Sequence, residues 1–280
     1  ALLCCEMGNN IKSKKKFLSV FDFKAHYISW SSNQSQSDTK ITLFHGDMRT
    51  SRSFDYVSKK LALYSHVYAY DFLGHGDSDW PGIKYRLNDR SREIIHFTQN
   101  ITHSKCIGIG HSNGAVALTL AALQKPHLFQ KIILMEPMLI VDENFQKMVS
   151  KRKWRTWNDL DELKQTLQSH DLTKNWDQEV TNDVLNYETF KSGEGIGIKW
   201  DKLTMAWDHR KGDYLDVLNI LPKLEMPVLF IISETHGDKY SKLDPLISQH
   251  AHFNKTTIHN SGHNMYMEQP DTVSNEIQEF

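Results

Sequence analysis

The most informative segment of the chain is Cys106-Ile107-Gly108-Ile109-Gly110-His111-Ser112-Asn113-Gly114-Ala115. An apolar run rich in isoleucine ends there in Gly-His-Ser-Asn-Gly, and residues 115–123 are strong helix formers at helical spacing. The pattern predicts a strand, a tight turn and a helix in direct succession. Gly-x-Ser-x-Gly at such a junction is typical of a nucleophile elbow, whose strained turn lifts the serine hydroxyl above the sheet edge. Ser112 is therefore the candidate nucleophile, and the flanking glycines allow positive φ and close packing of the helix on the strand.

The same segment has a second interpretation. Gly108, Gly110 and Gly114, placed between a strand and a helix, resemble a loosened dinucleotide-binding turn, with Glu136 at the end of the next strand. The glycines do not have Gly-x-Gly-x-x-Gly spacing, and no other nucleotide-binding feature accompanies them. A nucleotide-binding oxidoreductase is the weaker alternative.

Composition narrows the class of protein. The chain has 280 residues, 33 Lys and Arg against 34 Asp and Glu, and a formal net charge of −1, so no broad basic surface favours a nucleic-acid partner. No apolar run approaches the length of a transmembrane helix. Three cysteines, one of them Cys106 in a predicted core strand, are too few for a disulfide framework, which favours a reducing, cytoplasmic compartment. Because the sequence begins at Ala1, residues 1–5 also fit the remnant of a cleaved leader. Nothing in the sequence indicates an oligomeric state.

Strand and helix patterns alternate along most of the chain. Lys12 to Lys16, with four lysines in five residues, predicts a solvated terminal face rather than contact with a membrane surface. The expected strands are a strand or hairpin over 20–30, then 41–47 running into a loop, 66–72, a strand starting at 104, 131–135, 227–232 and 255–259. The expected helices are 51–63, 88–102, 115–123 and 270–280. This alternation predicts an α/β fold with a mainly parallel sheet and helices on both faces.

The alternation stops between residues 138 and 222. This stretch is helical, charged and aromatic in pattern, without a convincing buried strand. It holds five of the seven tryptophans, which are Trp154, Trp157, Trp176, Trp200 and Trp207. The sequence therefore predicts a core formed by residues 1–137 and 223–280, with residues 138–222 as an inserted helical lid.

Four motifs identify a family resemblance. In chain order they are His45-Gly46, Asp71-x-x-Gly74-His75-Gly76-x-Ser78-Asp79, the Gly-His-Ser-Asn-Gly pentapeptide, and Ser261-Gly262-His263 ahead of Glu268-Gln269-Pro270. With these motifs the chain resembles an α/β-hydrolase from about residue 21 to residue 280. It looks most like the lidded lipase and esterase branch, which includes peroxisomal-lipase-like sequences. The resemblance implies an eight-stranded, mainly parallel sheet with the lid after the sixth strand.

A serine hydroxyl needs a neighbouring base to become a nucleophile at neutral pH. His263 is the expected base, since it lies in the loop after the last strand and completes the order nucleophile, acid, histidine that is typical of this fold. The other histidines near the C-terminal end lack a compact metal-ligand spacing; they are His236, His250, His252 and His259. We expect neither a catalytic metal nor a cofactor.

The acid that orients the histidine has two rival candidates. The resemblance implies a carboxylate three residues beyond a glycine after the strand 227–232, but Ser233 replaces that glycine and His236 occupies the third position. Asp238 follows two residues later and is marginally preferred. Glu136 is the rival, because some family members carry the acid directly after the preceding strand. Glu234 is a poorer third choice.

The resemblance also implies an oxyanion hole and a substrate pocket. The backbone amides of Asn113 and Asp47 are the expected donors to the oxyanion. Asp47 is a departure, because its carboxylate must either point away or meet a polar group of the substrate. The residues expected to shape the substrate pocket are His45, Gly46, His111, Trp154, Trp157 and Trp207.

These features predict a serine hydrolase that cleaves a carboxylic ester through an acyl-enzyme. The expected substrate is a small-molecule or lipid ester, with a thioester as a further option. The main alternative is a protein of the same fold that binds a ligand without turning it over, because the acid is displaced and Asp47 is unusual.

Overall fold

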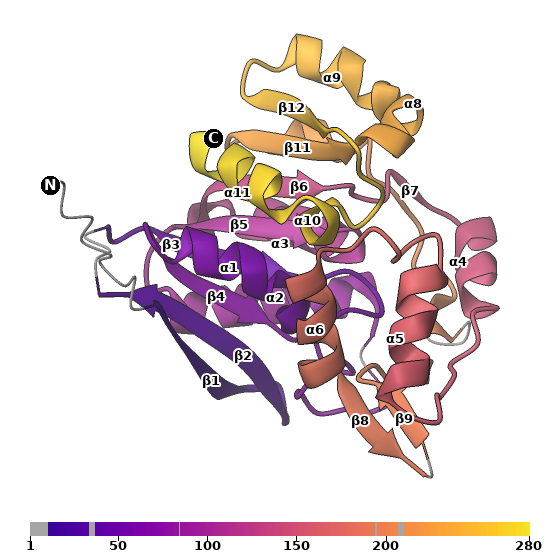
Figure 1. Ribbon diagram of the computed structural model, residues 1–280. Helices are drawn as coiled ribbons and strands as arrows, with labels where there is room; N and C mark the ends of the chain where they lie inside the picture. The colour runs from indigo at the N-terminus through magenta and orange to yellow at the C-terminus, as the bar shows by residue number, and fades with distance from the viewer. Residues whose placement is uncertain (1–10, 34–36, 84, 194, 207–209) are drawn as a thin grey trace, which may run out of the picture.

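A computed structural model describes residues 11–33, 37–83, 85–193, 195–206 and 210–280. Its centre is one eight-stranded sheet (Figure 1). In spatial order the strands are β1 (Ile11–Val20), β2 (Phe23–Ser32), β4 (His66–Tyr70), β3 (Lys40–Phe44), β5 (Cys106–His111), β6 (Phe129–Met135), β11 (Val228–Ser233) and β12 (Phe253–Ile258). Strands β4 to β12 of this sheet run parallel, while β2 pairs antiparallel with β1 and β4. The predicted eight-stranded, mainly parallel sheet is confirmed.

The central strands are apolar along their length because both faces of the sheet are covered. In β11, Val228, Phe230 and Ile232 pack into one hydrophobic core, whereas Leu229 and Ile231 pack into another. Side chains alternate between the two faces of a strand, so one continuous apolar run supplies both cores.

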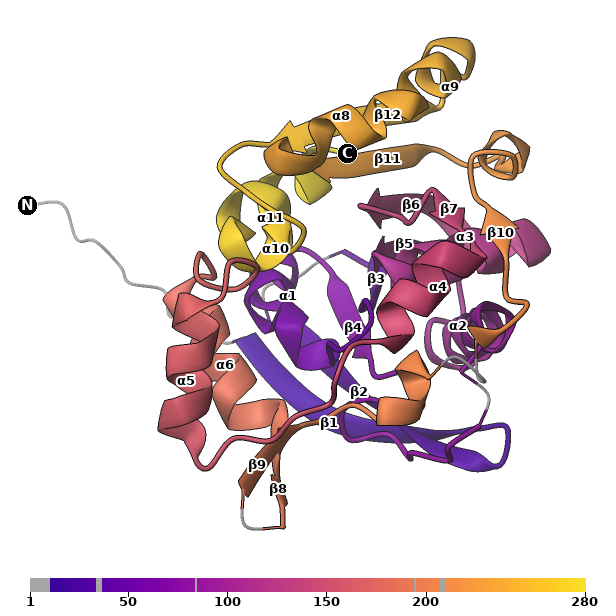
Figure 2. The same cartoon turned by 90° about the vertical axis from the view of Figure 1, so that its right-hand side faces the viewer.

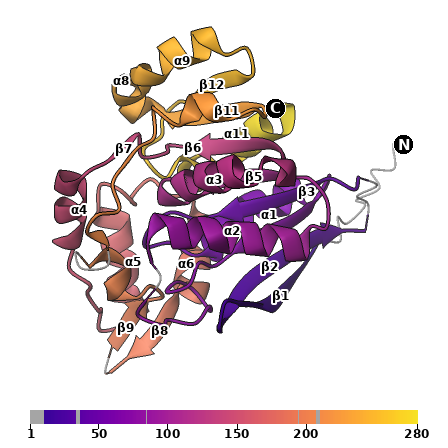
Figure 3. The ribbon, with the colours of Figure 1, turned by 180° about the vertical axis from the view of Figure 1, so that it is seen from behind.

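Helices form the two outer layers. α1 (Asp55–Leu61), α10 (Met265–Glu268) and α11 (Pro270–Glu279) cover one face (Figure 1), and α2 (Leu87–Ile101) and α3 (Asn113–Gln124) cover the other (Figure 3). The predicted helix 51–63 divides into the 3-10 turn η1 (Ser51–Phe54) and α1. The remaining core elements are η2 (Pro126–Leu128), η4 (Leu221–Lys223), η5 (Glu234–His236), α8 (Gly237–Tyr240), η6 (Ser241–Leu243) and α9 (Asp244–Gln249).

The lysine-rich segment is solvent-exposed, as the sequence suggested, and it forms part of an edge strand of the sheet. Lys12 to Lys16 lie in β1, which pairs with β2 over ten residues, and their side chains are exposed. Lysine on an edge strand discourages pairing with another chain, so a strand with these residues does not show the expected apolar alternation.

The insertion between β6 and β11 gathers on one side of the molecule (Figures 1 and 2). Its helices are α4 (Glu143–Ser150), α5 (Leu160–Ser169) and α6 (Gln178–Tyr187), followed by the 3-10 turn η3 (Lys202–Met205). Each of the three α-helices begins after an aspartate whose carboxylate accepts a backbone N–H of the first turn; these are Asp142, Asp159 and Asp177. Two short strand pairs accompany them, β7 (Ile140–Val141) with β10 (Leu215–Asp216) and β8 (Thr189–Ser192) with β9 (Gly195–Ile198).

Two further observations bear on the sequence-based expectations. Among the described residues, no helix combines the length and the apolar character that crossing a bilayer requires. Cys106 is buried with a free thiol, whereas Cys4 and Cys5 lie outside the described residues.

Candidate active site

Ser112 occupies the turn between β5 and α3. Its backbone has φ 52° and ψ −117°, a strained conformation for a residue with a side chain. The two glycines beside it are sterically required. A Cβ on Gly110 would lie 2.6 Å from Cα of Ala115, and a Cβ on Gly114 would lie 2.4 Å from the carbonyl oxygen of His45. The predicted succession of strand, strained turn and helix is therefore present.

Ser112, Glu136 and His263 line one cavity of about 430 Å³. The cavity lies at the carboxyl ends of β5 and β6, where ligand sites of parallel sheets are usually found. A hydrogen bond ties its two walls together, because the His111 Nε2–H donates to the carbonyl oxygen of His263 at 2.8 Å. Burial lowers the pKa of His111 to about 3, so its ring is neutral and donates from Nε2 only. The structure thus brings the predicted nucleophile Ser112 and the predicted base His263, which are distant in the sequence, to one cavity.

Glu136 is the carboxylate that contacts His263. Its Oε2 lies 2.6 Å from Nδ1 of His263, while its Oε1 accepts the backbone N–H of Ser233 at 3.0 Å and also the Ser233 hydroxyl. Burial alone would raise the pKa of Glu136, but the hydrogen bond and charge of His263 and the bonds from Ser233 and His236 lower it to about 2. The carboxylate is therefore ionised at neutral pH although its side chain is fully buried.

The other acid candidates lie elsewhere. Asp238 is exposed in α8 and is not one of the residues that line the cavity. Glu234 instead binds the ring of His259, at 3.1 Å, and the backbone N–H of Asn260, at 2.8 Å. The chain turns into η5 and α8 directly after β11, and among the described residues no hydrogen bond or ion pair joins Asp238 to His263. Of the three candidates, the structure places only Glu136 against the histidine, which reverses the marginal preference for Asp238.

His236 is a member of this cluster that sequence reasoning missed. Its Nδ1 lies 2.8 Å from the same Oε2 of Glu136 that contacts His263. The ligand atoms of Glu136, His236 and His263 lie within 4.8 Å of one another, so the group could hold a metal ion. The two distances equally fit charge-assisted hydrogen bonds from two ring N–H groups to one carboxylate. A signal existed in the sequence, since His236 occupies the position at which the family resemblance implies the acid.

Asp47 lines the cavity, and its carboxylate is paired with positive charges. Its carboxylate accepts hydrogen bonds from Arg90 at 2.7 Å, from Arg210 at 2.9 Å and from the side-chain amide of Asn113 at 2.9 Å. Burial would raise the pKa of Asp47, but the two guanidinium groups hold it well below its usual range. The sequence offered no signal for this network, because both arginines are distant in the chain. They neutralise the charge that made Asp47 seem out of place.

His45 and Gly46 shape the turn next to the elbow. His45 Nε2 accepts the backbone N–H of Phe72 at 3.2 Å, so its Nδ1–H donates to the carbonyl oxygen of Gly46 at 2.7 Å. Burial lowers the pKa of His45 to about 4, which keeps the ring neutral. A Cβ on Gly46 would lie 2.9 Å from the His111 ring. Neither His45 nor Gly46 lines the cavity; both hold the loop that carries Asp47.

The predicted tryptophans differ in their placement. Trp157 lines the cavity, as does Trp176, which was not chosen as a pocket residue. Trp154 does not line it, and its ring N–H donates to the carbonyl oxygen of Trp200 at 3.2 Å. Trp207 lies outside the described residues.

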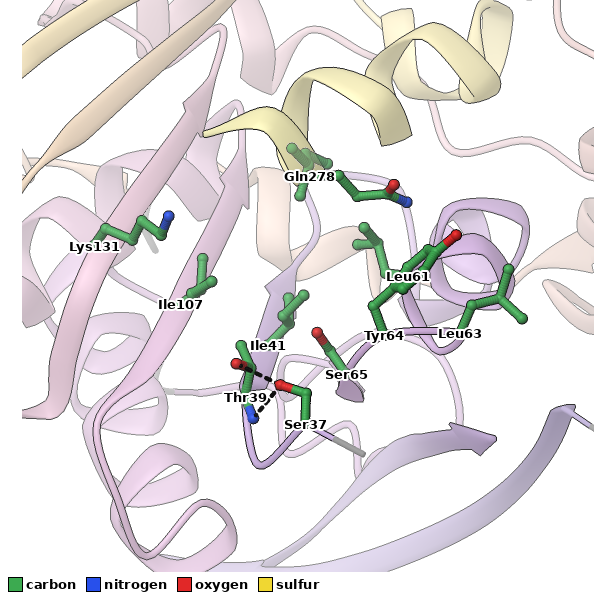
Figure 4. A pocket seen from close by; sticks show the side chains of 11 residues that line it. Ser37, Thr39, Ile41, Leu61, Leu63, Tyr64, Ser65, Ile107, Lys131 and Gln278 are labelled. Atoms are coloured by element: carbon green, nitrogen blue, oxygen red, sulfur yellow. Dashed lines mark hydrogen bonds between the residues drawn. The ribbon is translucent and has the colours of Figure 1, made fainter. Parts of the chain in front are cut away.

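A larger cavity, of about 670 Å³, opens near the amino-terminal ends of β3, β5 and β6. Ile41, Ile107 and Lys131 line it together with the ends of α1 and α11, and Ser37 and Thr39 form hydrogen bonds at its edge (Figure 4). The described residues of its lining include neither a histidine nor a carboxylate. Volume alone therefore does not identify the site; the side chains with acid–base chemistry lie at the opposite end of the strands.

Curated relatives align with a part of the chain. Ethanol acetyltransferase 1 from Kluyveromyces marxianus is 30% identical over 95 residues, which cover 33% of this chain and 26% of the relative. A monoglyceride lipase homolog from Monkeypox virus is 29% identical over 110 residues, which cover 36% of this chain and 39% of the relative. In both cases the match spans well under half of the relative's length.

Solved structures match nearly the whole chain. E-2-(acetamidomethylene)succinate hydrolase has a TM-score of 0.82 at 17% identity, covering 96% of this chain and 99% of its own. A thioesterase domain from the curacin biosynthetic pathway has a TM-score of 0.80 at 18% identity, with coverage of 96% and 100%. The peroxisomal α/β-hydrolase Lpx1 from Saccharomyces cerevisiae has a TM-score of 0.70 at 14% identity, with coverage of 97% and 87%. At these identities the likeness shows the α/β-hydrolase fold alone.

The family match comes from the sequence itself. The profile of the family described as serine aminopeptidase, S33, matches residues 35–188, which is more than half of the chain and includes the elbow and Glu136. This match supports a hydrolase. The chain therefore belongs to the serine aminopeptidase, S33, family of α/β-hydrolases.

Proposed function

We propose that this protein is a serine hydrolase that cleaves a carboxylic ester or thioester through an acyl-enzyme. The observation that carries the proposal is the buried, ionised Glu136 carboxylate 2.6 Å from Nδ1 of His263, in the cavity that Ser112 also lines. The substrate is a small molecule or a lipid, and the chemistry needs no cofactor.

The hydrogen bond to Glu136 sets the tautomer of His263. With the Nδ1–H donating to the carboxylate, the lone pair of the ring is on Nε2 and can accept the proton of Ser112. Glu136 then stabilises the imidazolium as the serine oxygen attacks the substrate carbonyl. His263 next returns the proton to the leaving oxygen or sulfur, and a water activated by the same ring releases the acyl group.

Two backbone amides are proposed to hold the oxyanion that forms during attack. Asn113 is the first residue of α3, so its N–H has no acceptor within the helix. The amide of Asp47 follows the turn that His45 and Gly46 hold. The Asp47 side chain does not oppose a developing negative charge, because Arg90 and Arg210 neutralise it. The unusual Asp47 was one reason to consider a protein that binds a ligand without turning it over, and its pairing with the two arginines removes that reason.

Residues 138–222 are proposed to act as a lid over the site. Phe145 and Val149 of α4 and Leu167 of α5 line the cavity together with the catalytic candidates. A lining of this kind excludes water from the reacting groups and suits an apolar acyl or alkyl chain. The lipase and thioesterase names among the similar proteins are consistent with such a substrate.

Hydrolysis of 4-nitrophenyl esters of increasing chain length tests the proposal. We expect turnover by the wild type and a loss of about 10³-fold or more in Ser112→Ala. Ser248→Ala, which removes an exposed hydroxyl far from the cavity, is the matched control and should keep full activity. No hydrolysis of any ester, or equal rates in the wild type and Ser112→Ala, would refute the proposal. The corresponding 4-nitroanilides show whether amides are also cleaved.

A further inference from the structure

We propose that the substrate carries an anionic group, a carboxylate or a phosphate, which Arg152, Arg155 and Lys239 bind at the mouth of the cavity. This inference rests on the hydrolase function proposed above. All three side chains line the cavity and are exposed. Arg152 and Arg155 follow α4 in the insertion, whereas Lys239 belongs to α8 of the core. Cations from two separate parts of the fold therefore converge on one opening.

These cations have no carboxylate partner among the residues that the structure describes. The guanidinium of Arg155 lies over the Trp157 ring at 4.7 Å, and the Lys239 ammonium lies over the Tyr240 ring at 5.2 Å. Arg152 contacts the sulfur of Met48 at 3.9 Å. Contacts with rings and sulfur hold a cationic group in place without neutralising its charge. The three positive charges are therefore available to a ligand.

The other charges of the cavity are already paired. Its lining includes two carboxylates, of which Asp47 is bound by two arginines and Glu136 by two histidines. Arg49, a further cation of the lining, lies 3.3 Å from Glu188. Among the described residues of the lining, the unpaired charge is thus positive only, which favours an anionic ligand and disfavours a cationic one.

The rest of the lining shows where the anion belongs on the substrate. Apolar side chains fill the space around the catalytic candidates; they are Met138, Phe145, Val149, Leu167, Leu172, Trp176 and Met205. The cations are exposed and so lie toward solvent. A substrate that fits both features has an apolar segment next to the scissile carbonyl and its anionic group farther away.

The test compares acids with their isosteric amides. One pair carries the group on the acyl side, mono-4-nitrophenyl adipate against the 4-nitrophenyl ester of adipic acid monoamide. The other carries it on the leaving side, 4-acetoxyphenylacetate against its primary amide. For at least one pair we expect kcat/KM to favour the acid about tenfold, equivalent to roughly 1.4 kcal/mol. Raising the salt from about 0.01 M to about 1 M should remove most of this preference, because exposed charges are screened.

Substitutions locate the effect. The triple variant Arg152→Ala, Arg155→Ala, Lys239→Ala should lose the preference for the acid while cleaving the amide at nearly the wild-type rate. Lys153→Ala is the matched control, since Lys153 is exposed on the same loop but does not line the cavity, and it should keep the preference. A phosphonate in place of the preferred carboxylate distinguishes the two anions, because a higher kcat/KM for the phosphonate assigns the site to phosphate.

Two outcomes would overturn this inference alone. One is equal kcat/KM for acid and amide in both pairs, and the other is an equal loss of preference in Lys153→Ala and the triple variant. Failure of the proposed hydrolase function differs from both, since neither the acids nor the amides would then be cleaved.

Discussion

Two buried carboxylates face the same cavity, and their partners are of opposite kinds. Glu136 is bound by His263 and His236, whose imidazole is the side chain that most often serves as a general base. Asp47 is bound by Arg90 and Arg210, whose charges are permanent. Both carboxylates have a lowered pKa. A shifted pKa therefore does not by itself mark a catalytic group; the chemistry of the partner does.

The largest expected effect is on kcat, which should fall far more when Glu136 is substituted than when Asp47 is. Glu136→Gln keeps the shape but no longer selects the productive tautomer of His263, so we expect kcat to fall by about 10⁴-fold. Asp47→Asn should lower kcat by about tenfold or less, because Asp47 touches no proton that moves. Asp238→Asn serves as the control and should match the wild type. Steady-state kinetics on one 4-nitrophenyl ester measures all three, and a loss below tenfold in Glu136→Gln would overturn the assigned roles.

The second prediction concerns stability. Although Glu136 should matter more for kcat, the free energy of unfolding should depend more on Asp47 than on Glu136. Asp47→Ala leaves two almost fully buried guanidinium groups without their carboxylate, which costs about 3–5 kcal/mol of unfolding free energy. Asp77→Ala is the matched control, because Asp77 pairs with the more exposed Lys15 and Lys199 and should cost less than about 1 kcal/mol. Urea denaturation followed by circular dichroism measures both. Equal losses of unfolding free energy in the two variants would show that the buried ion pairs of Asp47 stabilise the protein no more than the exposed pairs of Asp77.

The pH dependence of stability sharpens the description of Glu136. Its folded-state pKa of about 2 lies below the ordinary 4.5, so its charge stabilises the folded protein above pH 4.5 and this contribution disappears as the pH falls toward 2. The full contribution amounts to roughly 3 kcal/mol at neutral pH. The difference in unfolding free energy between the wild type and Glu136→Gln should therefore shrink between pH 5 and pH 3. A difference that stays constant over this range would mean that Glu136 is not charged in the way described.

The smallest effect concerns the second histidine. His236→Gln removes one of two donors to Glu136 Oε2 but leaves the bond to His263, so we expect kcat to change by less than about tenfold with KM unaltered. His250→Gln, far from the cavity, is the comparison variant. If kcat fell as much in His236→Gln as in Glu136→Gln, His236 would be as important for catalysis as His263, contrary to this prediction.

Features encoded locally could be predicted from the sequence. The elbow at Ser112, the alternation of strands and helices, and the late position of His263 all follow from short motifs and periodicity, and the fold agrees with them. The edge strand β1 was not predicted, because its run of exposed lysines lacks the alternation of apolar and polar residues by which strands are recognised.

The assignment of the acid depended on features that no local pattern contains. The choice between Glu136 and Asp238 rests on the folded path of the chain, which places Glu136 at the end of β6 against His263 and leaves Asp238 exposed in α8. The partners of Asp47 come from α2 and from Arg210, far along the chain, so only the folded structure shows that its charge is balanced.

Covalent labelling shows directly whether Ser112 is the nucleophile. The protein is treated with a fluorophosphonate and its intact mass is measured, followed by peptide mapping. We predict a single adduct on Ser112, absent in Ser112→Ala and formed far more slowly in His263→Ala and Glu136→Gln. No adduct, or an adduct on a different serine, would contradict the account.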